Sequence, residues 1–252
     1  MVQPLVTVLR DAAAVIALVL IWQLVTVVFS VPAFLLPPPS AIAQALAANV
    51  GRIGGALAQT ATEAALGFVG GNVLGLTLAM AFARWGSLER VGLPLAIALR
   101  SIPLIAIAPL LTIILGFGAT TIVVMAVLIS FFPALVAGAS GLRAPSADAL
   151  ALMRVLDAPE RVLYARLRIP AALPFVFAAF KITAPASVLA AMVAEWTAAN
   201  SGLGYLIIDA GEQYRFPLMW AGTVVATALA VAAFVLASFG ERRVISWPVE
   251  SA

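Results

Sequence analysis

The stretch LRAPSADALALMRVLDAPERVLYARLRIPAALP, residues 142–174, decides the fold because it is the one long polar interval in an otherwise apolar chain. It holds five arginines and three acids, and it lies between apolar segments at 119–140 and 173–196. Loops this charged do not lie in lipid, and an excess of arginine marks the cytoplasmic side of a membrane protein. The stretch therefore predicts a cytoplasmic loop through which a soluble partner moves the membrane part.

The composition excludes several classes of protein. Hydrophobic residues make up 64% of the 252 residues and charged residues only 10%, whereas soluble domains carry about 25% charged residues. Cysteine and histidine are absent, and the single lysine lies in no phosphate-loop motif. This removes disulfides, most transition-metal sites and an ATP site in this chain. We predict an integral membrane protein without a nucleic-acid partner.

Six apolar stretches predict an all-α, polytopic membrane protein with a single domain, residues 1–252, in the lipid bilayer. The core of this domain is expected at about 60–240. A signal peptide is the alternative for the first stretch, but the stretch is long and no small-residue cleavage site follows it. The predicted spans are 12–29, 60–83, 93–115, 119–140, 173–196 and 218–239.

Prolines and polar residues predict how the first two spans are joined. Pro32 and Pro37–Pro39 fix the backbone and remove donors, so an extended connector follows the first span. Residues 40–58 are expected to form a helix on the outer face. Thr60 and Glu63 resemble a capping box that opens the second span.

Two further patterns lie inside the predicted spans. Gly67, Gly71 and Gly75 fall four residues apart on one face of the second span, and this spacing lets another backbone approach closely. Pro103 and Pro109 predict a break or kink in the third span, which is tolerated where it is buried in protein or lines a cavity. The third span, with Pro103 and Pro109, and the fifth span, with Pro185, are therefore candidate walls of a substrate path.

The basic residues orient the spans. Ten of the fourteen fall in segments that six spans place inside, whereas Arg52 and Arg215 fall outside. Arg100 and Lys181 lie within spans, nearer the inner end. The asymmetry predicts that both termini and the 142–172 loop face the cytoplasm.

The motifs resemble those of a known family, the permeases of binding-protein-dependent ABC transporters, in the nitrate/sulfonate/taurine and thiamine-precursor branch. In the family's cytoplasmic loop motif, the glycine falls on Asp157, and the closing Ile-x-Leu-Pro retains only Pro170. The resemblance implies the MetI-like fold of type I ABC importers. It covers residues 33–248 and rests on IPLIAIAPLL (102–111), FFPALVAG (131–138), RIPAALPF (168–175), AEW (194–196) and SGLGY (201–205).

The loop is predicted to contain two helices, 147–156 and 160–167, with a turn at Asp157–Pro159. A solvated linker is the alternative, although linkers seldom mix apolar and charged residues at helical spacing. The resemblance implies that the second helix docks in a groove of an ATPase subunit. The coupling residues are then Asp157, Glu160, Arg161, Val162, Leu163, Tyr164 and Pro170.

Five more residues are candidates for the substrate path. Glu63 and Glu195 are acids near the outer ends of two spans, where an interfacial acid in water or, for Glu63, a helix cap is the alternative. Trp196 either stacks on a flat ring of the substrate or belongs to an interfacial aromatic belt. Arg100 and Lys181 either contact the substrate or snorkel to the inner headgroups.

The resemblance implies the membrane subunit of an ATP-driven importer in the inner membrane of a prokaryote. It would act as a homodimer with two ATPase subunits and a periplasmic or lipid-anchored binding protein. ATP and Mg would bind to the ATPases, so no cofactor and no enzyme activity are expected in this chain. The expected solute is a thiamine-related pyrimidine, with sulfonate, taurine or nitrate as the alternative. A secondary transporter would need coupling acids near the bilayer midplane, and a membrane enzyme would need catalytic side chains; we find neither in the sequence.

Overall fold

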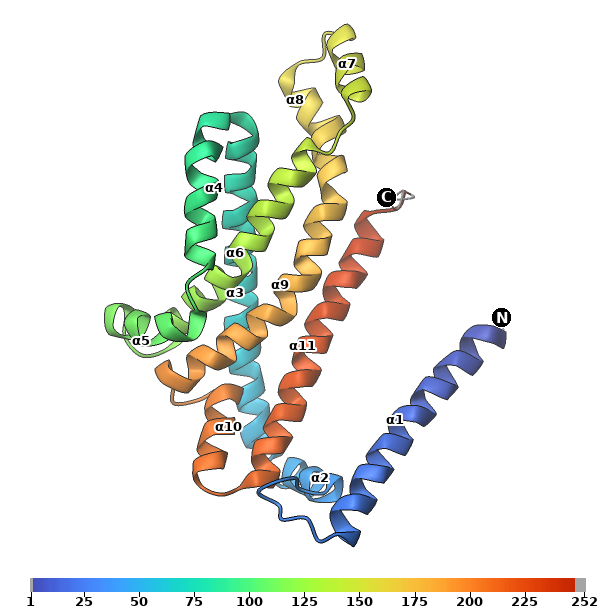
Figure 1. Ribbon diagram of the computed structural model, residues 1–252, viewed down its shortest axis with the longest axis vertical. Helices are drawn as coiled ribbons and strands as arrows, with labels where there is room; N and C mark the ends of the chain where they lie inside the picture. Colours follow the sequence, from blue (N-terminus) through green and yellow to red (C-terminus); the bar gives the residue numbers. More distant parts are fainter. Residues whose placement is uncertain (1, 248–252) are drawn as a thin grey trace.

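The computed structural model describes residues 2–247, and this part of the chain is helical without a strand (Figure 1). Residues 1 and 248–252, including the last residue of the resemblance, lie outside the described part. The elements are α1 (Val2–Val28), α2 (Pro39–Ala48), α3 (Val50–Arg84), α4 (Gly86–Arg100), α5 (Leu104–Leu115), α6 (Ala119–Arg143), α7 (Ala147–Val155), α8 (Glu160–Leu163), the π-helix η1 (Tyr164–Arg168), α9 (Ile169–Ala198), α10 (Leu203–Glu212) and α11 (Phe216–Val244).

Among the described residues, four helices are long and apolar enough to cross a membrane. They are α3, α6, α11 and the continuous helix from Glu160 to Ala198, which contains α9. The helices α4 and α5 pass the same test only as a bent pair, and α1 contributes a shorter apolar stretch, Ala13–Val28. Each of the six predicted spans thus has a helical counterpart, although the fifth is much longer than 173–196.

The predicted break in the third span is confirmed, with α4 and α5 meeting at an angle of 102°. Helix α4 begins at Gly86, earlier than predicted, and ends at Arg100. Pro103 is the N-cap of α5, where its missing N–H costs nothing. Pro109 lies inside α5 and does not end the helix, so only one of the two prolines makes the break.

The core lies where α3, α6 and α9 pack together. The glycines of α3 determine how closely α3 and α6 approach each other. A Cβ on Gly71 would lie 2.5 Å from the Val127 carbonyl oxygen, and one on Gly75 would lie 2.5 Å from the carbonyl oxygen of Phe131. At these distances the hydrogen of glycine fits at each position, whereas a Cβ does not. The predicted close approach of another backbone is confirmed, and the partner is α6.

Polar side chains join the same three helices inside the core. The Asn72 amide of α3 donates to Thr183 Oγ1 of α9 at 3.3 Å, and the hydroxyls of Ser130 on α6 and Ser187 on α9 lie 2.7 Å apart. Hydrogen bonds of this kind hold helices together where lipid removes the hydrophobic driving force between them.

The predicted start of the second span is wrong. Helix α3 begins at Val50 and runs unbroken past Thr60 and Glu63, so these residues do not form a capping box. The physical reason is that residues 50–59 contain no proline and that Ile53 and Ala56 are buried in the core, so packing carries the helix through its three glycines. The predicted helix at 40–58 is therefore divided between α2 and the first turns of α3.

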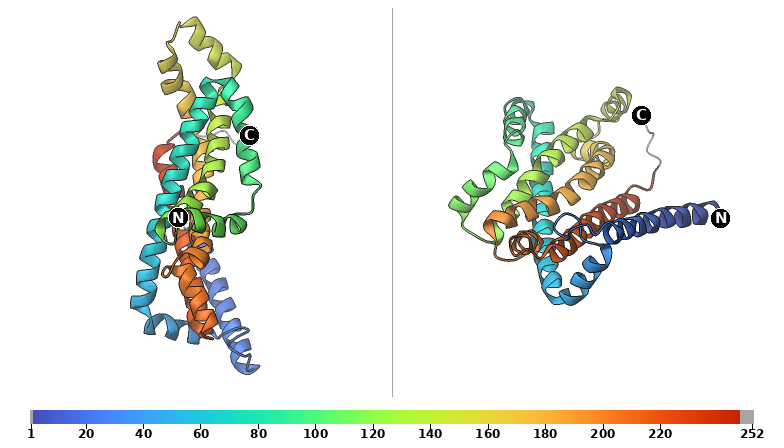
Figure 2. Two further views of the ribbon diagram at one scale, coloured as in Figure 1. Left: turned by 90° about the vertical axis from the view of Figure 1, so that its left-hand side faces the viewer. Right: turned by 60° about the horizontal axis from the view of Figure 1, so that its bottom comes forward.

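Helix α1 leans away from the other helices (Figures 1 and 2). It is attached near its C-terminal end, where Gln23 exchanges hydrogen bonds with the backbone and hydroxyl of Ser40, and Trp22 packs on Trp220 at 5.6 Å. The extended proline connector is confirmed at Pro38, whose φ of −65° and ψ of 144° are those of polyproline II.

The two ends of the bundle differ. At one end, α7 and α8 extend beyond the other helices, whereas α2 and α10 lie at the opposite end (Figure 1). We refer to these as the loop end and the α10 end. The predicted outer loop at 197–217 is thus not a simple loop, because it contains α10.

Candidate functional site

Helices α7 and α8 project from the loop end of the bundle, and α7 is the first helix of this projection (Figure 1). The Ser146 hydroxyl caps it by accepting a hydrogen bond from the Ala149 N–H at 3.2 Å, and Asp148 lies in the first turn. An acid at this position is favoured because the helix N-terminus carries partial positive charge. The helix predicted at 147–156 is confirmed to within one residue.

Asp157 turns the chain at the end of α7. Its φ of 48° is left-handed. The Asp157 N–H bonds to the Arg154 carbonyl and the Ala158 N–H to the Met153 carbonyl, each at 3.0 Å. These two bonds form a Schellman cap, in which the left-handed residue is usually glycine. Aspartate is among the few other residues that adopt this conformation, so it takes the place of the family's glycine without changing the turn.

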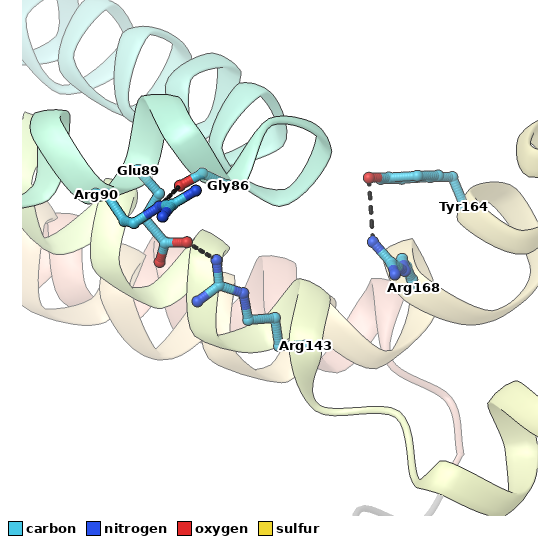
Figure 3. A network of polar contacts seen from close by, with 6 residues as sticks. All are labelled: Gly86, Glu89, Arg90, Arg143, Tyr164 and Arg168. Atoms are coloured by element: carbon cyan, nitrogen blue, oxygen red, sulfur yellow. Dashed lines mark hydrogen bonds and ion pairs between the residues drawn. The ribbon is translucent and has the colours of Figure 1, made fainter.

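The second helix of the loop continues directly into the membrane part. Helix α8 begins at Glu160, as predicted, and Pro159 is its N-cap. The π-helix η1 follows, and the Arg168 guanidinium both donates to the Tyr164 hydroxyl at 3.1 Å and lies 4.9 Å from the ring centroid (Figure 3). Since α8, η1 and α9 form one unbroken helix, a displacement of α8 is transmitted directly to α9.

Apolar side chains lie exposed on this projection. On α7 and its C-cap, Leu152, Val155 and Leu156 are 60%, 83% and 65% exposed, whereas Val162 is 40% exposed. We call these four residues the α7–α8 surface. Leu163, Tyr164 and Pro170, which were predicted as coupling residues, are only partly exposed, while Asp157, Glu160 and Arg161 are exposed.

Sequence reasoning missed the three residues on α7. The signal was present, because residues 152, 155 and 156 have the three- and four-residue spacing of one helix face. An apolar face that carries no core contacts and extends away from the bundle is typical of a docking site.

Ion pairs link the loop end to the rest of the bundle. Arg84 at the end of α3 contacts Glu160 of α8 at 3.2 Å. Arg143 at the end of α6 donates to Glu89 of α4 (Figure 3). Four helices are thereby connected at this end, although such exposed pairs contribute little to stability individually.

The structure places the predicted path residues in three separate regions. Arg100 and Pro103 are exposed on either side of the break between α4 and α5, where the Arg100 guanidinium lies 4.9 Å from the ring centroid of Phe132. Lys181 on α9 contacts both carboxylate oxygens of Glu241 on α11, at 2.7 and 2.9 Å. The charge of Lys181 is thus paired within the bundle.

Glu195 is fully buried at the α10 end. Its Oε1 accepts from the Thr60 hydroxyl and its Oε2 from the Gly204 N–H, each at 2.6 Å, while Thr60 Oγ1 accepts from the Leu203 N–H at 2.8 Å. Glu63 lies beside it with only 3% exposure. The alternatives of an interfacial acid in water and of a helix cap are both wrong for these residues.

The sequence motifs AEW and SGLGY thus meet at one site, which sequence reasoning did not predict. Gly202 has a φ of 104°, and a Cβ there would lie 2.3 Å from the Glu195 carboxyl carbon. Only glycine lets the backbone wrap around the carboxylate so closely. Trp196, the neighbour of Glu195, is 42% exposed on the surface of the subunit.

A cavity of about 460 Å³ opens between α3, α9 and α11. Its lining is apolar and includes Phe68, Phe177 and Phe180. It offers none of the polar groups that orient a polar solute in a binding pocket.

This fold defines a class of protein: a multi-pass helical membrane protein with a helical, partly apolar projection at one end. Residues 71–246 match the family described as binding-protein-dependent transport system inner membrane component. The chain belongs to this family. It is the transmembrane subunit of an ABC importer, a membrane permease that is not itself catalytic.

Three relatives are informative. The chain is 31% identical to a probable ABC transporter permease of Haemophilus influenzae, over 88% of this chain and 91% of the relative. It is also 31% identical to the formylaminopyrimidine transport permease ThiX of Halalkalibacterium halodurans, over 69% of this chain and 70% of ThiX. A Bacillus subtilis relative named for aliphatic sulfonates transport, SsuC, is 27% identical over 91% of this chain and 84% of its own length.

A solved structure shares the fold. A chain of the MetNI methionine ABC transporter, determined in inward facing conformations, superposes with a TM-score of 0.65 at 19% identity. The match covers 75% of this chain and 94% of the other. The predicted MetI-like fold is confirmed.

Proposed function

We propose that two copies of this chain form the translocation path of the importer and that each copy binds one ATPase subunit through its α7–α8 surface. ATP and Mg bind to the ATPases, and a periplasmic or lipid-anchored binding protein delivers the solute. The observation that carries the proposal is the exposed apolar face of Leu152, Val155 and Leu156 on a capped helix that projects from the bundle.

Transmission of movement follows from the continuity of the chain. When the two ATPases close on ATP, they move the α7–α8 surface, and the unbroken helix from Glu160 to Ala198 passes that movement to the core. The Arg84–Glu160 ion pair couples the end of α3 to the movement of α8. Alternating access then arises as the two subunits rotate between inward-open and outward-open arrangements.

The α4–α5 break supports a path between two subunits. Non-helical backbone at membrane depth is tolerated where it is buried in protein or lines a cavity, and Ser101, Ile102 and Pro103 at the break are exposed in the single subunit. Arg100 and Pro103 are therefore the best candidates for the wall of the path, and Trp196 is a further aromatic candidate. Glu63, Glu195 and Lys181 are engaged within the subunit and reach a solute only if those contacts open.

The α7–α8 surface is tested by adding charge to it. Val155→Asp should abolish co-purification of the ATPase and uptake in reconstituted vesicles, because a carboxylate buried in the docking groove without a partner costs several kcal/mol. Ala147→Asp is the matched control, since it adds the same charge at the other end of α7, where the helix dipole favours it. Unchanged ATPase binding by Val155→Asp would place the contact elsewhere.

We propose a thiamine-related pyrimidine as the solute, supported by the likeness to ThiX. Sulfonate, taurine or nitrate is the second candidate, supported by the likeness to SsuC. Calorimetric titration of the importer's binding protein separates the two, because a pyrimidine and a taurine solution can be compared on the same sample. Saturable heat with taurine alone would overturn the first assignment.

A further inference from the structure

The two buried acids at the α10 end have unequal hydrogen-bond surroundings. Both oxygens of Glu195 accept a hydrogen bond from a donor at 2.6 Å, as a carboxylate does. Glu63 accepts one bond, from the Gln59 amide at 3.2 Å, through Oε1. Its Oε2 is buried and has no hydrogen-bond partner in the described chain.

Among the described residues, no cation balances the two acids. In the part of the chain that the structure describes, no basic side chain forms an ion pair with Glu63 or Glu195. Charged groups on the helices around them are paired elsewhere or exposed. Arg52 of α3 pairs with Asp209 of α10, and Lys181 of α9 pairs with Glu241 of α11. Glu212 and Arg215 are exposed. Two adjacent carboxylates in an apolar interior without a counter-ion are strongly unfavourable.

We propose that Glu63 and Glu195 form a proton-sharing acid pair in which Glu63 Oε2 carries the proton and donates it to the ionised Glu195. One proton removes the like-charge repulsion and gives the unpartnered oxygen of Glu63 a hydrogen to donate. It leaves both oxygens of Glu195 free to hold Thr60 and Gly204. Proton binding at this site is a property in addition to the transport function of the family.

The pair positions α10. Glu195 of α9 holds the N-terminus of α10 through Gly204 and reaches α3 through Thr60, which in turn accepts from Leu203. A negative charge at the start of α10 also satisfies the donors that a helix N-terminus leaves unpaired. The shared proton thus allows one ionised acid to be buried where three helices meet.

Infrared spectroscopy of the purified complex with its ATPase tests the proton directly. In deuterated buffer at about pH 8, exposed acids are ionised, so a protonated-carboxyl C=O band reports a buried acid. We expect Glu63→Gln to remove one carboxyl from this band. Glu241→Gln, which changes a carboxylate paired with Lys181, should leave the band unchanged. Absence of the band in the wild type, or an unchanged band intensity in Glu63→Gln, would overturn the proposal.

Cysteine labelling distinguishes the role of Glu63, which carries the proton, from that of Glu195, which accepts hydrogen bonds. The chain has no cysteine, and Ala210 is a buried residue on α10, so Ala210→Cys reports opening of this helix. Labelling should stay slow when Glu63→Gln is added, because the amide donates to Glu195 as the protonated acid does. It should become about tenfold faster with Glu195→Gln, which has one acceptor oxygen for two donors. Equal labelling rates in the two variants would contradict the assigned roles.

Discussion

At the scale of single residues, Asp157 shows how a side chain departs from a family motif while the backbone keeps its shape. The left-handed backbone and the two bonds of the Schellman cap are those that glycine provides. Aspartate therefore retains the turn at some cost in strain.

We predict opposite effects for two substitutions at this position. Asp157→Gly should raise the thermal stability of the α7–α8 projection by roughly 1 kcal/mol, because glycine adopts a positive φ without steric cost. Asp157→Val should lower it by a similar or larger amount and weaken ATPase binding, because a β-branched residue is strained there. Limited proteolysis of the loop measures both, and equal protection of the two variants would contradict the explanation.

The Lys181–Glu241 pair gives a second prediction at this scale. Both side chains are less than one-third exposed, so Lys181→Met leaves a partly buried carboxylate unpaired and should cost roughly 1–3 kcal/mol. Adding Glu241→Gln should recover most of the loss, because a neutral pair needs no counter-ion. Thermal unfolding in detergent completes the double-mutant cycle, and simple additivity would show that the two residues are not coupled.

At the scale of elements, α3 depends on small residues that face α6. The three glycines leave no space for a side chain where α3 meets the carbonyl groups and side chains of α6. Hydrogen bonds from Asn72 to α9 and between Ser130 and Ser187 then fix the angle and register of the three helices.

Gly71→Ala should therefore destabilise the permease by roughly 1–3 kcal/mol, because the added Cβ forces the helices apart. Gly54→Ala is the matched control on the same helix. A Cβ at Gly54 meets nothing within 4 Å, so alanine there should be neutral or stabilising by about 1 kcal/mol. Unfolding temperatures of the two variants in one detergent give the comparison, and equal values would refute the close-approach argument.

At the scale of the whole molecule, the ends of the bundle have different chemistry. The loop end carries the arginine-rich projection and exposed ion pairs, whereas the α10 end carries the buried acid pair. The excess of arginine predicts that the loop end faces the cytoplasm.

The orientation is testable because the chain is free of cysteine. Ser146→Cys should react with a membrane-impermeant reagent only after cells are opened, since Ser146 is exposed at the start of α7. A cysteine in place of Gln213, exposed at the end of α10, should react in intact cells of an outer-membrane-permeabilised strain. Labelling of Ser146→Cys in such intact cells would invert the topology.

Residue patterns alone predicted the fold class, the approximate spans, the two helices and the turn of the loop, and the close approach at Gly67, Gly71 and Gly75. These follow from local properties: hydrophobic length, helical spacing and the steric size of glycine. The start of α3, which of the two prolines breaks the third span and the apolar face of α7 were not predicted, because each depends on how far a helix continues and on which of its faces finds a partner.

The surroundings of Glu63, Glu195 and Lys181 became visible only in the packed helices. In the sequence, an acid or a lysine near the end of an apolar span has the same appearance whether it meets water, lipid headgroups, a solute or another helix. The contacts that distinguish these cases join residues far apart in the chain: Thr60 with Glu195, and Lys181 with Glu241. Burial and pairing are properties of the packed helices, and no local pattern encodes which distant residue supplies the partner.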